Sequence, residues 1–495
     1  MRRDRSRRGG STGAARRCYR ARVVSGRPPW SPFPLSDVSN GEWCPRPPSA
    51  RQRLAATLLA EQAGRRARRH GLSRRDFLRT AAGTATAFMV LNTVHGLDQW
   101  GDAAVLPVKA EHCDDLAGEH ERLRARYFVM DVQTHHVDLT LPYIRPDRIL
   151  GQVACGLRFF ARDVPCSLEK LELLGQMNYV KEVFVDSETA VGVISGVPLG
   201  TILPVETMAR TRDLVNQLAG SERALSQAMI DPTAPPGTQT ATDSLEHQKS
   251  LGARAIKCYT GTPAGGWWLD SDVGHGMIEQ ARAAGFRLIN VHKGFPLGFG
   301  PMVDEYVHTR DLPAAAAQWP DLDFCAYHSG YFPGQGIGEF LADVAPIGKR
   351  GNVYAEIGSA FATAFLESPE QAAHLIGSLL KTLGPKRILW GTDSIWWGSP
   401  RWQIDAFKTL VISPRMQDEF GYPPLTRKTK ARILGLNAAR LYGVKPRRER
   451  CTVPDALDRA REEQGGVRAQ ATLEAYGPRT RREFLAFLRH QARSG

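Results

Sequence analysis

The feature that most constrains the fold is a repeat of short apolar runs, each followed by a turn cluster and a longer stretch with helical spacing. Eight runs follow residue 126, namely 127–135, 180–186, 224–230, 253–260, 286–292, 323–328, 352–357 and 387–393. This alternation is typical of βα units that build a parallel sheet. The runs are almost continuously apolar, which fits strands buried on both faces. Eight parallel strands within about 270 residues predict an α/β fold, a (β/α)8 barrel of the TIM type.

The remaining chain divides around this barrel, which we place at residues 111–446. Residues 1–72 are rich in Arg, Pro, Gly and Ser and predict a disordered basic leader. Residues 447–495 predict a charged helical tail with an amphipathic pattern at Phe484, Leu485 and Leu488.

Residues 73–110 form a signal-like region. Ser-Arg-Arg-Asp-Phe-Leu-Arg at 73–79 precedes a weakly apolar run, 80–94, and then small residues at Ala103-Ala104 and Ala110. This pattern is similar to a twin-arginine export signal. The run is shorter than the ~20 apolar residues that cross a bilayer, so no permanent membrane span is expected. The pattern predicts a bacterial protein exported by the twin-arginine machinery to the periplasm or another site outside the cytoplasm.

The basic character of the chain is confined to its N-terminal part. Residues 1–110 hold 21 of the 65 Lys and Arg residues and 7 of the 51 Asp and Glu residues, so the whole excess of 14 positive charges lies there. No positive field on the barrel that would attract DNA or RNA is implied, and no nucleic-acid partner is expected. The eight cysteines include no Cys-x-x-Cys pair, which argues against a zinc ribbon.

Polar side chains close most of the apolar runs. They are Gln133 and His135 in the first run, Lys257, His292, His328, Glu356 and Asp393. In a (β/α)8 barrel, the carboxyl ends of the strands form the active-site face. The sequence therefore predicts that these side chains converge at one mouth of the barrel.

With these residues placed, the chain resembles the amidohydrolase superfamily, in the amidohydrolase-related branch that includes aminocarboxymuconate-semialdehyde decarboxylase. The resemblance covers 128–444. It rests on Asp131-Val132-Gln133-Thr134-His135 where the family has Asp-x-His-x-His, on Val291-His292, on Tyr327-His328-Ser329-Gly330, on Trp390-Gly391-Thr392-Asp393, and on Asn437-Ala438-Ala439-Arg440-Leu441. Members of this family use a divalent ion to activate water.

The resemblance implies a role for each matched residue. His135, His292 and Asp393 would be metal ligands, with zinc as the expected ion. His328 would be a further ligand or a proton-transfer group, and Asp393 could also act as general base. Lys257 would orient a substrate carboxylate.

Gln133 departs from the family pattern because it stands where the first histidine is expected. An amide is a weaker ligand than imidazole for such ions. Three alternatives follow: a mononuclear site completed by the Gln133 oxygen or water, a site rebuilt around other ligands, or a metal-free descendant.

The expected function is a metal-dependent hydrolase acting on an amide, ester or lactone-like bond of a small organic substrate. A decarboxylase of an aromatic or enoic acid is the alternative within the same family, and a metal-free ligand-binding barrel is the alternative from another class. Aromatic residues after the same strands, including Trp267, Phe295, Tyr331 and Trp396, either line a pocket or pack loops onto helices. A homodimer is expected by analogy alone.

Overall fold

The computed structural model describes residues 31–35, 48–97, 102–116, 121–157, 166–262, 265–295, 304–446 and 455–466. Its centre is an eight-stranded sheet in the order β1-β2-β3-β4-β7-β8-β9-β10, in which every pair is parallel. The strands are β1 (Val129–Thr134), β2 (Thr189–Ile194), β3 (Ala224–Ile230), β4 (Ala255–Tyr259), β7 (Leu288–Gly294), β8 (Asp323–Tyr331), β9 (Val353–Glu356) and β10 (Ile388–Leu389). A small hairpin, β5 (Gly261–Thr262) and β6 (Gly265–Gly266), follows β4.

The sheet closes between its first and last strands. Val132 donates its backbone N–H to the Trp390 carbonyl at 3.0 Å, and Asp393 donates to the Gln133 carbonyl at 2.9 Å. A parallel bridge between Thr134 and Ser394 continues the pairing past the end of β10. The predicted (β/α)8 barrel is therefore confirmed.

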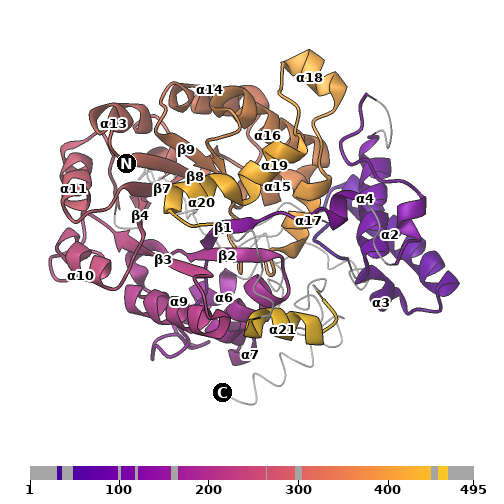
Figure 1. The fold of residues 1–495 in the computed structure, drawn as a ribbon, viewed down its shortest axis with the longest axis horizontal. Helices are drawn as coiled ribbons and strands as arrows, with labels where there is room; N and C mark the ends of the chain where they lie inside the picture. Colours follow the sequence, from indigo (N-terminus) through magenta and orange to yellow (C-terminus); the bar gives the residue numbers. More distant parts are fainter. Residues whose placement is uncertain are drawn as a thin grey trace, which may run out of the picture.

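Helices surround this barrel (Figure 1). Between strands run α6 (Ile149–Gly156), α7 (Leu168–Glu172), α8 (Gln176–Val180), α9 (Val205–Ala219), α10 (Leu245–Ser250), α11 (Asp272–Ala283), α13 (Leu312–Gln318), α14 (Ile337–Gly348), α15 (Ala360–Glu367) and α16 (Pro369–Leu383). After β10 come α17 (Arg401–Thr409), α18 (Pro414–Phe420), α19 (Arg427–Ala431) and α20 (Asn437–Tyr442). The sequence indicates where such helices begin. Helix α16 is capped by Ser368, whose side chain accepts the Gln371 N–H, and its first residue is Pro369.

One predicted strand is wrong. Residues 180–185 are helical, forming the end of α8 and the π-helical turn η3 (Lys181–Val185), and the second strand is instead residues 189–194. The β-branched run was misleading because Tyr179, Val183 and Phe184 lie on one helical face and are completely buried. Phe184 and Tyr179 pack over Gly192 of β2, where a Cβ atom would lie 3.0 Å from the Phe184 ring.

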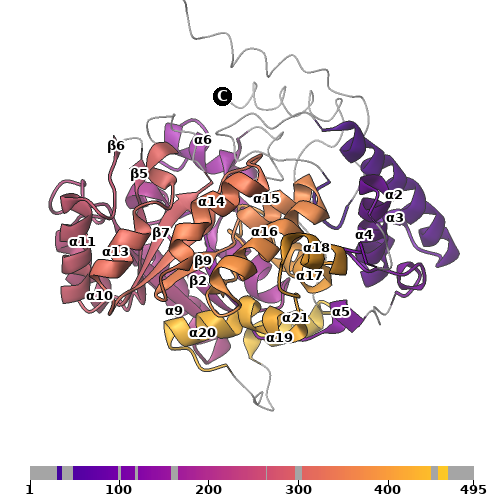
Figure 2. The ribbon, with the colours of Figure 1, turned by 90° about the horizontal axis from the view of Figure 1, so that it is seen from above.

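The N-terminal residues form a helical unit on the flank of the barrel (Figures 1 and 2). It contains α2 (Ala50–Arg69), α3 (Arg74–Leu78) and α4 (Ala81–His95), followed by the turn η1 (Glu111–Cys113) and α5 (Glu121–Arg124). Helix α2 lies within the segment predicted to be disordered, so that part of residues 1–72 is folded. Of the predicted tail, α21 (Ala456–Glu463) is helical, and Phe484, Leu485 and Leu488 lie outside the described residues. Within the described ranges, no helix is both long and apolar enough to cross a bilayer.

Candidate active site

The predicted site residues lie at the carboxyl ends of their strands and are almost completely buried. Gln133 is the second-last residue of β1 with His135 just beyond the strand, Lys257 lies in β4, His292 in β7, His328 in β8 and Glu356 at the end of β9, while Asp393 follows β10. Each of these residues is 6% exposed or less. The barrel thus brings together groups from six strands that are up to 260 residues apart in the sequence.

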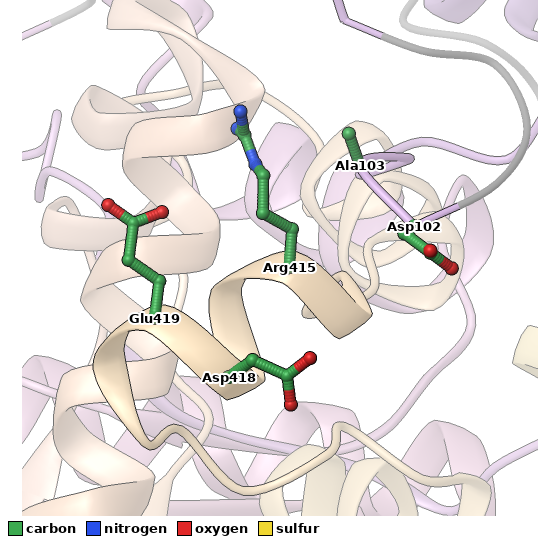
Figure 3. A pocket seen from close by; sticks show the side chains of 5 residues that line it. All are labelled: Asp102, Ala103, Arg415, Asp418 and Glu419. Carbon is green, nitrogen blue, oxygen red and sulfur yellow. The ribbon is translucent and has the colours of Figure 1, made fainter.

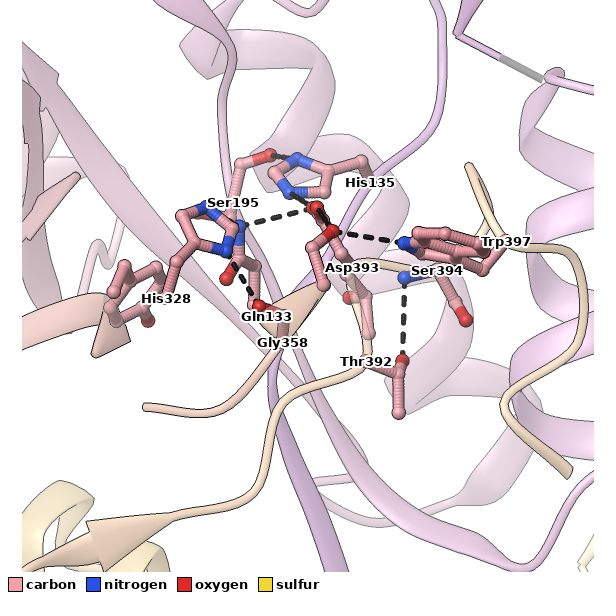
Figure 4. A network of polar contacts seen from close by, with 12 residues as sticks. Gln133, His135, Ser195, His328, Gly358, Thr392, Asp393, Ser394 and Trp397 are labelled. Atoms are coloured by element: carbon pink, nitrogen blue, oxygen red, sulfur yellow. Dashed lines mark hydrogen bonds and ion pairs between the residues drawn. The ribbon is translucent and has the colours of Figure 1, made fainter. Parts of the chain in front are cut away.

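Asp393 is the centre of this arrangement (Figure 4). Its Oδ1 lies 3.0 Å from His135 Nε2 and accepts a hydrogen bond from Gln133 Nε2 at 3.1 Å. Its Oδ2 accepts a hydrogen bond from the Ser359 hydroxyl. Burial opposes ionisation, but the hydrogen bond and charge of His135, together with Ser359, hold the pKa of Asp393 well below its usual range.

The histidines turn one ring nitrogen to the backbone and the other inward. His135 Nδ1 lies 2.6 Å from the Ser195 carbonyl and His328 Nδ1 lies 2.7 Å from the Gly358 carbonyl. A carbonyl can only accept, so each Nδ1 carries a proton and each Nε2 faces the site. His292 is anchored through Nε2, 3.0 Å from the Phe295 carbonyl, and its Nδ1 is buried without a partner.

Gln133 lies between the inward groups. Its Nε2 is 3.1 Å from Asp393 Oδ1 and 3.4 Å from His328 Nε2, so the amide N–H2 group donates toward both. Burial lowers the pKa of His328 to about 4, which keeps its Nε2 an acceptor at neutral pH. The Gln133 oxygen is buried and has no hydrogen-bond partner.

Lys257 and Glu356 have different surroundings. Among the described residues, Lys257 Nζ has no hydrogen-bond partner, and it lies 3.8 Å from the centre of the Tyr327 ring. Burial lowers its pKa, while the charge of Glu356 acts in the opposite direction. The Glu356 carboxyl instead accepts the backbone N–H groups of His328 and Gly358. Glu356 therefore supports the backbone of the two neighbouring strand ends and forms no hydrogen bond with Lys257 among the described residues.

Backbone strain is concentrated at this mouth. Among the described residues, the five non-glycine residues with positive φ all follow or end strands β7 to β10; they are Phe295, His328, Ser329, Ser359 and Asp393. A left-handed backbone costs a side-chain-bearing residue roughly 1–2 kcal/mol. Strain of this kind persists where surrounding contacts enforce it and is typical of active sites.

Ser359 was missed by the sequence analysis. It lies three residues after β9, donates to Asp393 and accepts a hydrogen bond from Trp397 Nε1 at 2.9 Å. Only the polar residues that end the apolar runs were considered, and Ser359 carries no motif that would have identified it. Its role depends on two neighbouring loops meeting in space.

The aromatic residues divide between the two roles left open by the sequence. Trp396 stacks on His135 with ring centres 5.2 Å apart, and Phe295 lies 5.6 Å from the His328 ring, so both border the site. Trp268 instead packs against Tyr306, and Phe332 packs against His308.

A surface groove of about 590 Å³ lies away from these residues, beside α18. It is lined by Asp102, Ala103, Arg415, Asp418 and Glu419 (Figure 3). None of the predicted site residues borders it, and its lining includes three carboxylates and one arginine. We therefore place the candidate site inside the barrel mouth and not in this groove.

The side chains at the barrel mouth are of the types that bind a divalent ion, but in this structure they are too far apart to coordinate one together. Protein ligands of zinc-like ions are histidines whose second ring nitrogen donates to a carbonyl, together with carboxylates. His135, His328 and Asp393 meet this description. Within the described ranges, however, no three His, Cys, Asp or Glu side chains converge closely enough to hold an ion. The Gln133 amide lies among them, and rotating it would present its unpartnered oxygen as a fourth ligand atom.

The fold and site together define a (β/α)8-barrel protein with a strained, buried polar centre where enzymes of this fold hold their catalytic residues. Residues 199–444, just under half of the chain, match the model of a family described as Amidohydrolase, and this match supports an enzyme. The match begins after β2 and includes Lys257, His292, His328 and Asp393. No curated protein matches the chain significantly.

Several solved structures are similar in fold. An uncharacterised TIM-barrel protein from Bordetella bronchiseptica is 17% identical, with 64% of this chain and 98% of that chain covered and a TM-score of 0.43. The 5-carboxyvanillate decarboxylase from Sphingomonas paucimobilis is 13% identical, with 65% of this chain and 100% of that chain covered and a TM-score of 0.38. An amidohydrolase from Burkholderia multivorans with bound zinc is 11% identical, with 64% of this chain and 100% of that chain covered and a TM-score of 0.40. At these scores, no inference about activity follows from the likenesses.

Proposed function

We propose that the chain is a hydrolase that activates water against an amide, ester or lactone-like bond of a small organic substrate. A divalent ion bound at Asp393, with zinc as the expected ion, would assist the reaction. The observation that supports this most directly is the contact between His135 Nε2 and Asp393 Oδ1. His135 already donates through Nδ1, so two lone pairs face one another at 3.0 Å unless a cation, either a proton or a metal ion, lies between them.

The chain's own residues would divide the work as follows. Asp393 is ionised and held from three sides, which fixes the direction of its carboxylate. His328 is neutral with its Nε2 inward, so it can accept a proton and return it to a leaving group. A bound divalent ion would polarise the scissile group and lower the pKa of water. His135, Asp393 and the Gln133 oxygen would hold it, with the inward nitrogens of His292 and His328 beside them.

Lys257 would orient the substrate. Its ammonium group is fully buried without a hydrogen-bond partner, an arrangement that costs stability unless an anion binds there. A substrate carboxylate is the natural partner. The same observation favours the second candidate, a decarboxylase of an aromatic or enoic acid, since that reaction also begins with a bound carboxylate.

Metal analysis by plasma mass spectrometry tests the first part of the proposal. We expect about one ion per chain in the native protein and loss of that ion in Asp393→Ala. Gln133→His should retain the ion through longer dialysis, because imidazole is the stronger ligand. His247→Ala, an exposed histidine on α10, is the matched control and should bind as the native protein does. Native protein without an ion would overturn the metal-dependent proposal and favour the metal-free alternatives.

A substrate panel separates the reaction types. Esters, amides and lactones are assayed for hydrolysis products, and aromatic and enoic carboxylates for released carbon dioxide. Carbon dioxide without hydrolysis would replace the hydrolase with the decarboxylase. Absence of turnover on every substrate, with binding retained, would favour the ligand-binding barrel; turnover abolished by Asp393→Asn would exclude it.

Export remains a proposal that two features support. The sequence at 73–79 keeps the twin-arginine pattern, and Arg74 is exposed. Cys155 and Cys166 form a disulfide, a bond typical of oxidising compartments outside the cytoplasm. The expected homodimer stays a prediction.

A further inference from the structure

The segment that resembles a removable export signal is packed into the side of the barrel. Ten of the fifteen residues of α4 are buried. Phe88 of α4 lies 5.3 Å from Phe33 and 6.1 Å from Phe365 of α15, and Phe33 also stacks on Trp402 of α17 at 6.5 Å. These rings belong to the same apolar cluster as the outer face of the sheet. Helix α4 therefore packs on the outside of the helical layer of the barrel, against α15 (Figure 2).

Helix α2 completes the unit. Its apolar residues Ala55, Leu59 and Ala63 recur every four positions and are 1% exposed or less, so one stripe of the helix is fully covered. Arg66 of α2 forms an ion pair with Asp114, beyond the signal-like region. The contact ties the first helix of the unit to the segment that leads into the barrel.

The backbone after α4 is also bound to the barrel. The Asn92 side chain is completely buried and donates to the Leu106 carbonyl at 2.6 Å. The Val105 carbonyl accepts the Val411 N–H at 2.9 Å, and the Asp102 carbonyl accepts the Arg415 N–H at 2.9 Å. Residues 102–106 are thus held along the segment that joins α17 to α18.

This placement covers one of the two positions where a signal peptidase would cut. Ala104 is 6% exposed and is followed by Val105 and Leu106, which are completely buried, whereas Ala110, two residues after the buried Val108, is exposed. Proteases cleave exposed, flexible segments, because the scissile backbone must leave its own structure to enter the protease. A signal of the twin-arginine type directs chains that fold before export, so processing would have to act on this folded form.

We propose that residues 50–116 remain in the mature enzyme as an uncleaved segment, whose helix α4 is a permanent layer against α15. The motif residues Phe77 and Leu78 are buried within the same unit, at 0% and 1% exposure. The segment would then have two roles: it would direct export before it packs against the barrel, and it would be a structural element afterwards.

The segment also supports the loop that carries Asp393. Trp402, covered by Phe33, donates through Nε1 to the Trp397 carbonyl at 3.3 Å. Trp397 in turn donates to Ser359, which donates to Asp393. Phe33 lies upstream of the segment and stacks on Phe88 within it, so loss of the chain up to Ala104 would remove this cover from Trp402, which gives a physical reason for retention.

The first test is the intact mass and N-terminal sequence of the full chain purified from the exported fraction of a bacterial host with a twin-arginine system. We expect a chain that begins upstream of residue 50. A chain that begins between residues 103 and 111 would overturn the proposal. If the protein stays in the cytoplasm, the second test decides.

The second test compares the thermal stability of variants of the full chain. Ala85→Asp places a carboxylate on the buried face of α4, whereas Leu54→Asp places the same group on the exposed face of α2. We expect Ala85→Asp to lower the single unfolding midpoint by several degrees and Leu54→Asp to leave it within about one degree. Phe88→Leu is the milder variant if Ala85→Asp does not fold. An unchanged midpoint in both α4 variants, or a separate early transition, would show that the unit is not part of the barrel fold and would overturn the proposal.

Discussion

Ser359 combines a backbone role and a side-chain role in one residue, and the two can be separated. Its φ of 52° is a conformation that glycine adopts freely, whereas its hydroxyl joins Trp397 to Asp393. Ser359→Ala and Ser359→Gly both remove the hydroxyl, but only glycine relieves the strain. We expect both variants to lose about tenfold or more in kcat, with Ser359→Gly about 1 kcal/mol more stable than Ser359→Ala.

Turnover and thermal unfolding of the two variants check this expectation. If Ser359→Gly kept native turnover, the hydroxyl would have no part in holding Asp393 and only the backbone conformation would matter.

The buried Lys257 side chain should lower the stability of the folded protein and contribute to substrate binding instead. Its ammonium is buried without a hydrogen-bond partner, so Lys257→Met should leave the protein as stable as the native form or more stable. The same change should raise KM for a carboxylate substrate at least tenfold, because the orienting charge is gone. Thermal unfolding and KM are the measurements.

The matched control is Lys293→Met in the next strand. Lys293 is equally buried but forms an ion pair with Asp311 at 2.8 Å, so its removal leaves an unpaired buried carboxylate and should cost about 3–5 kcal/mol. Equal destabilisation by the two variants would mean that Lys257 already has a structural partner, contrary to its proposed role.

At the scale of elements, the Trp-Gly-Thr-Asp segment after β10 depends on its glycine. A Cβ atom at Gly391 would lie 1.8 Å from Glu356 Oε1 and 3.2 Å from Gln133 Cβ. Gly391→Ala should therefore displace the carboxyl that holds the His328 backbone and lower the unfolding midpoint by several degrees. Gly338→Ala, in α14 with open space around it, is the control and should be neutral or stabilising. A fully stable Gly391→Ala would contradict this account of the motif.

The sequence predicted elements well where local pattern and burial agree. Seven of the eight apolar runs became strands, and their polar ends met at one mouth, because parallel strands share a direction. The strand prediction for 180–186 was wrong because apolar residues such as Val183 and Phe184 fit the pattern of a buried strand and that of a buried helical face. Only their packing over Gly192 selects the helix. Ser359 and the folded α2 could not be predicted for a related reason: their partners, Asp393 and the barrel flank, are distant in the sequence.

At the scale of the whole molecule, the disulfide reports which compartment the folded chain has reached. Cys155 in α6 and Cys166 before α7 are joined across eleven positions, on the segment that follows β1, whereas Cys113, Cys258 and Cys325 are buried free thiols. A disulfide of this span contributes roughly 2–3 kcal/mol and forms only where the compartment is oxidising. If the chain is exported, the bond should be complete in the exported protein and absent when Arg74→Lys with Arg75→Lys retains the chain in the cytoplasm.

Mass spectrometry of alkylated peptides measures this directly as the fraction of Cys155 linked to Cys166. Cys258, buried in β4, should remain a free thiol in both samples and serves as the internal control. The exported protein should also unfold at a higher temperature than the retained one, and Cys155→Ser should abolish that difference. Equal linkage in both compartments would show that the bond is independent of export and would remove it as support for the twin-arginine route.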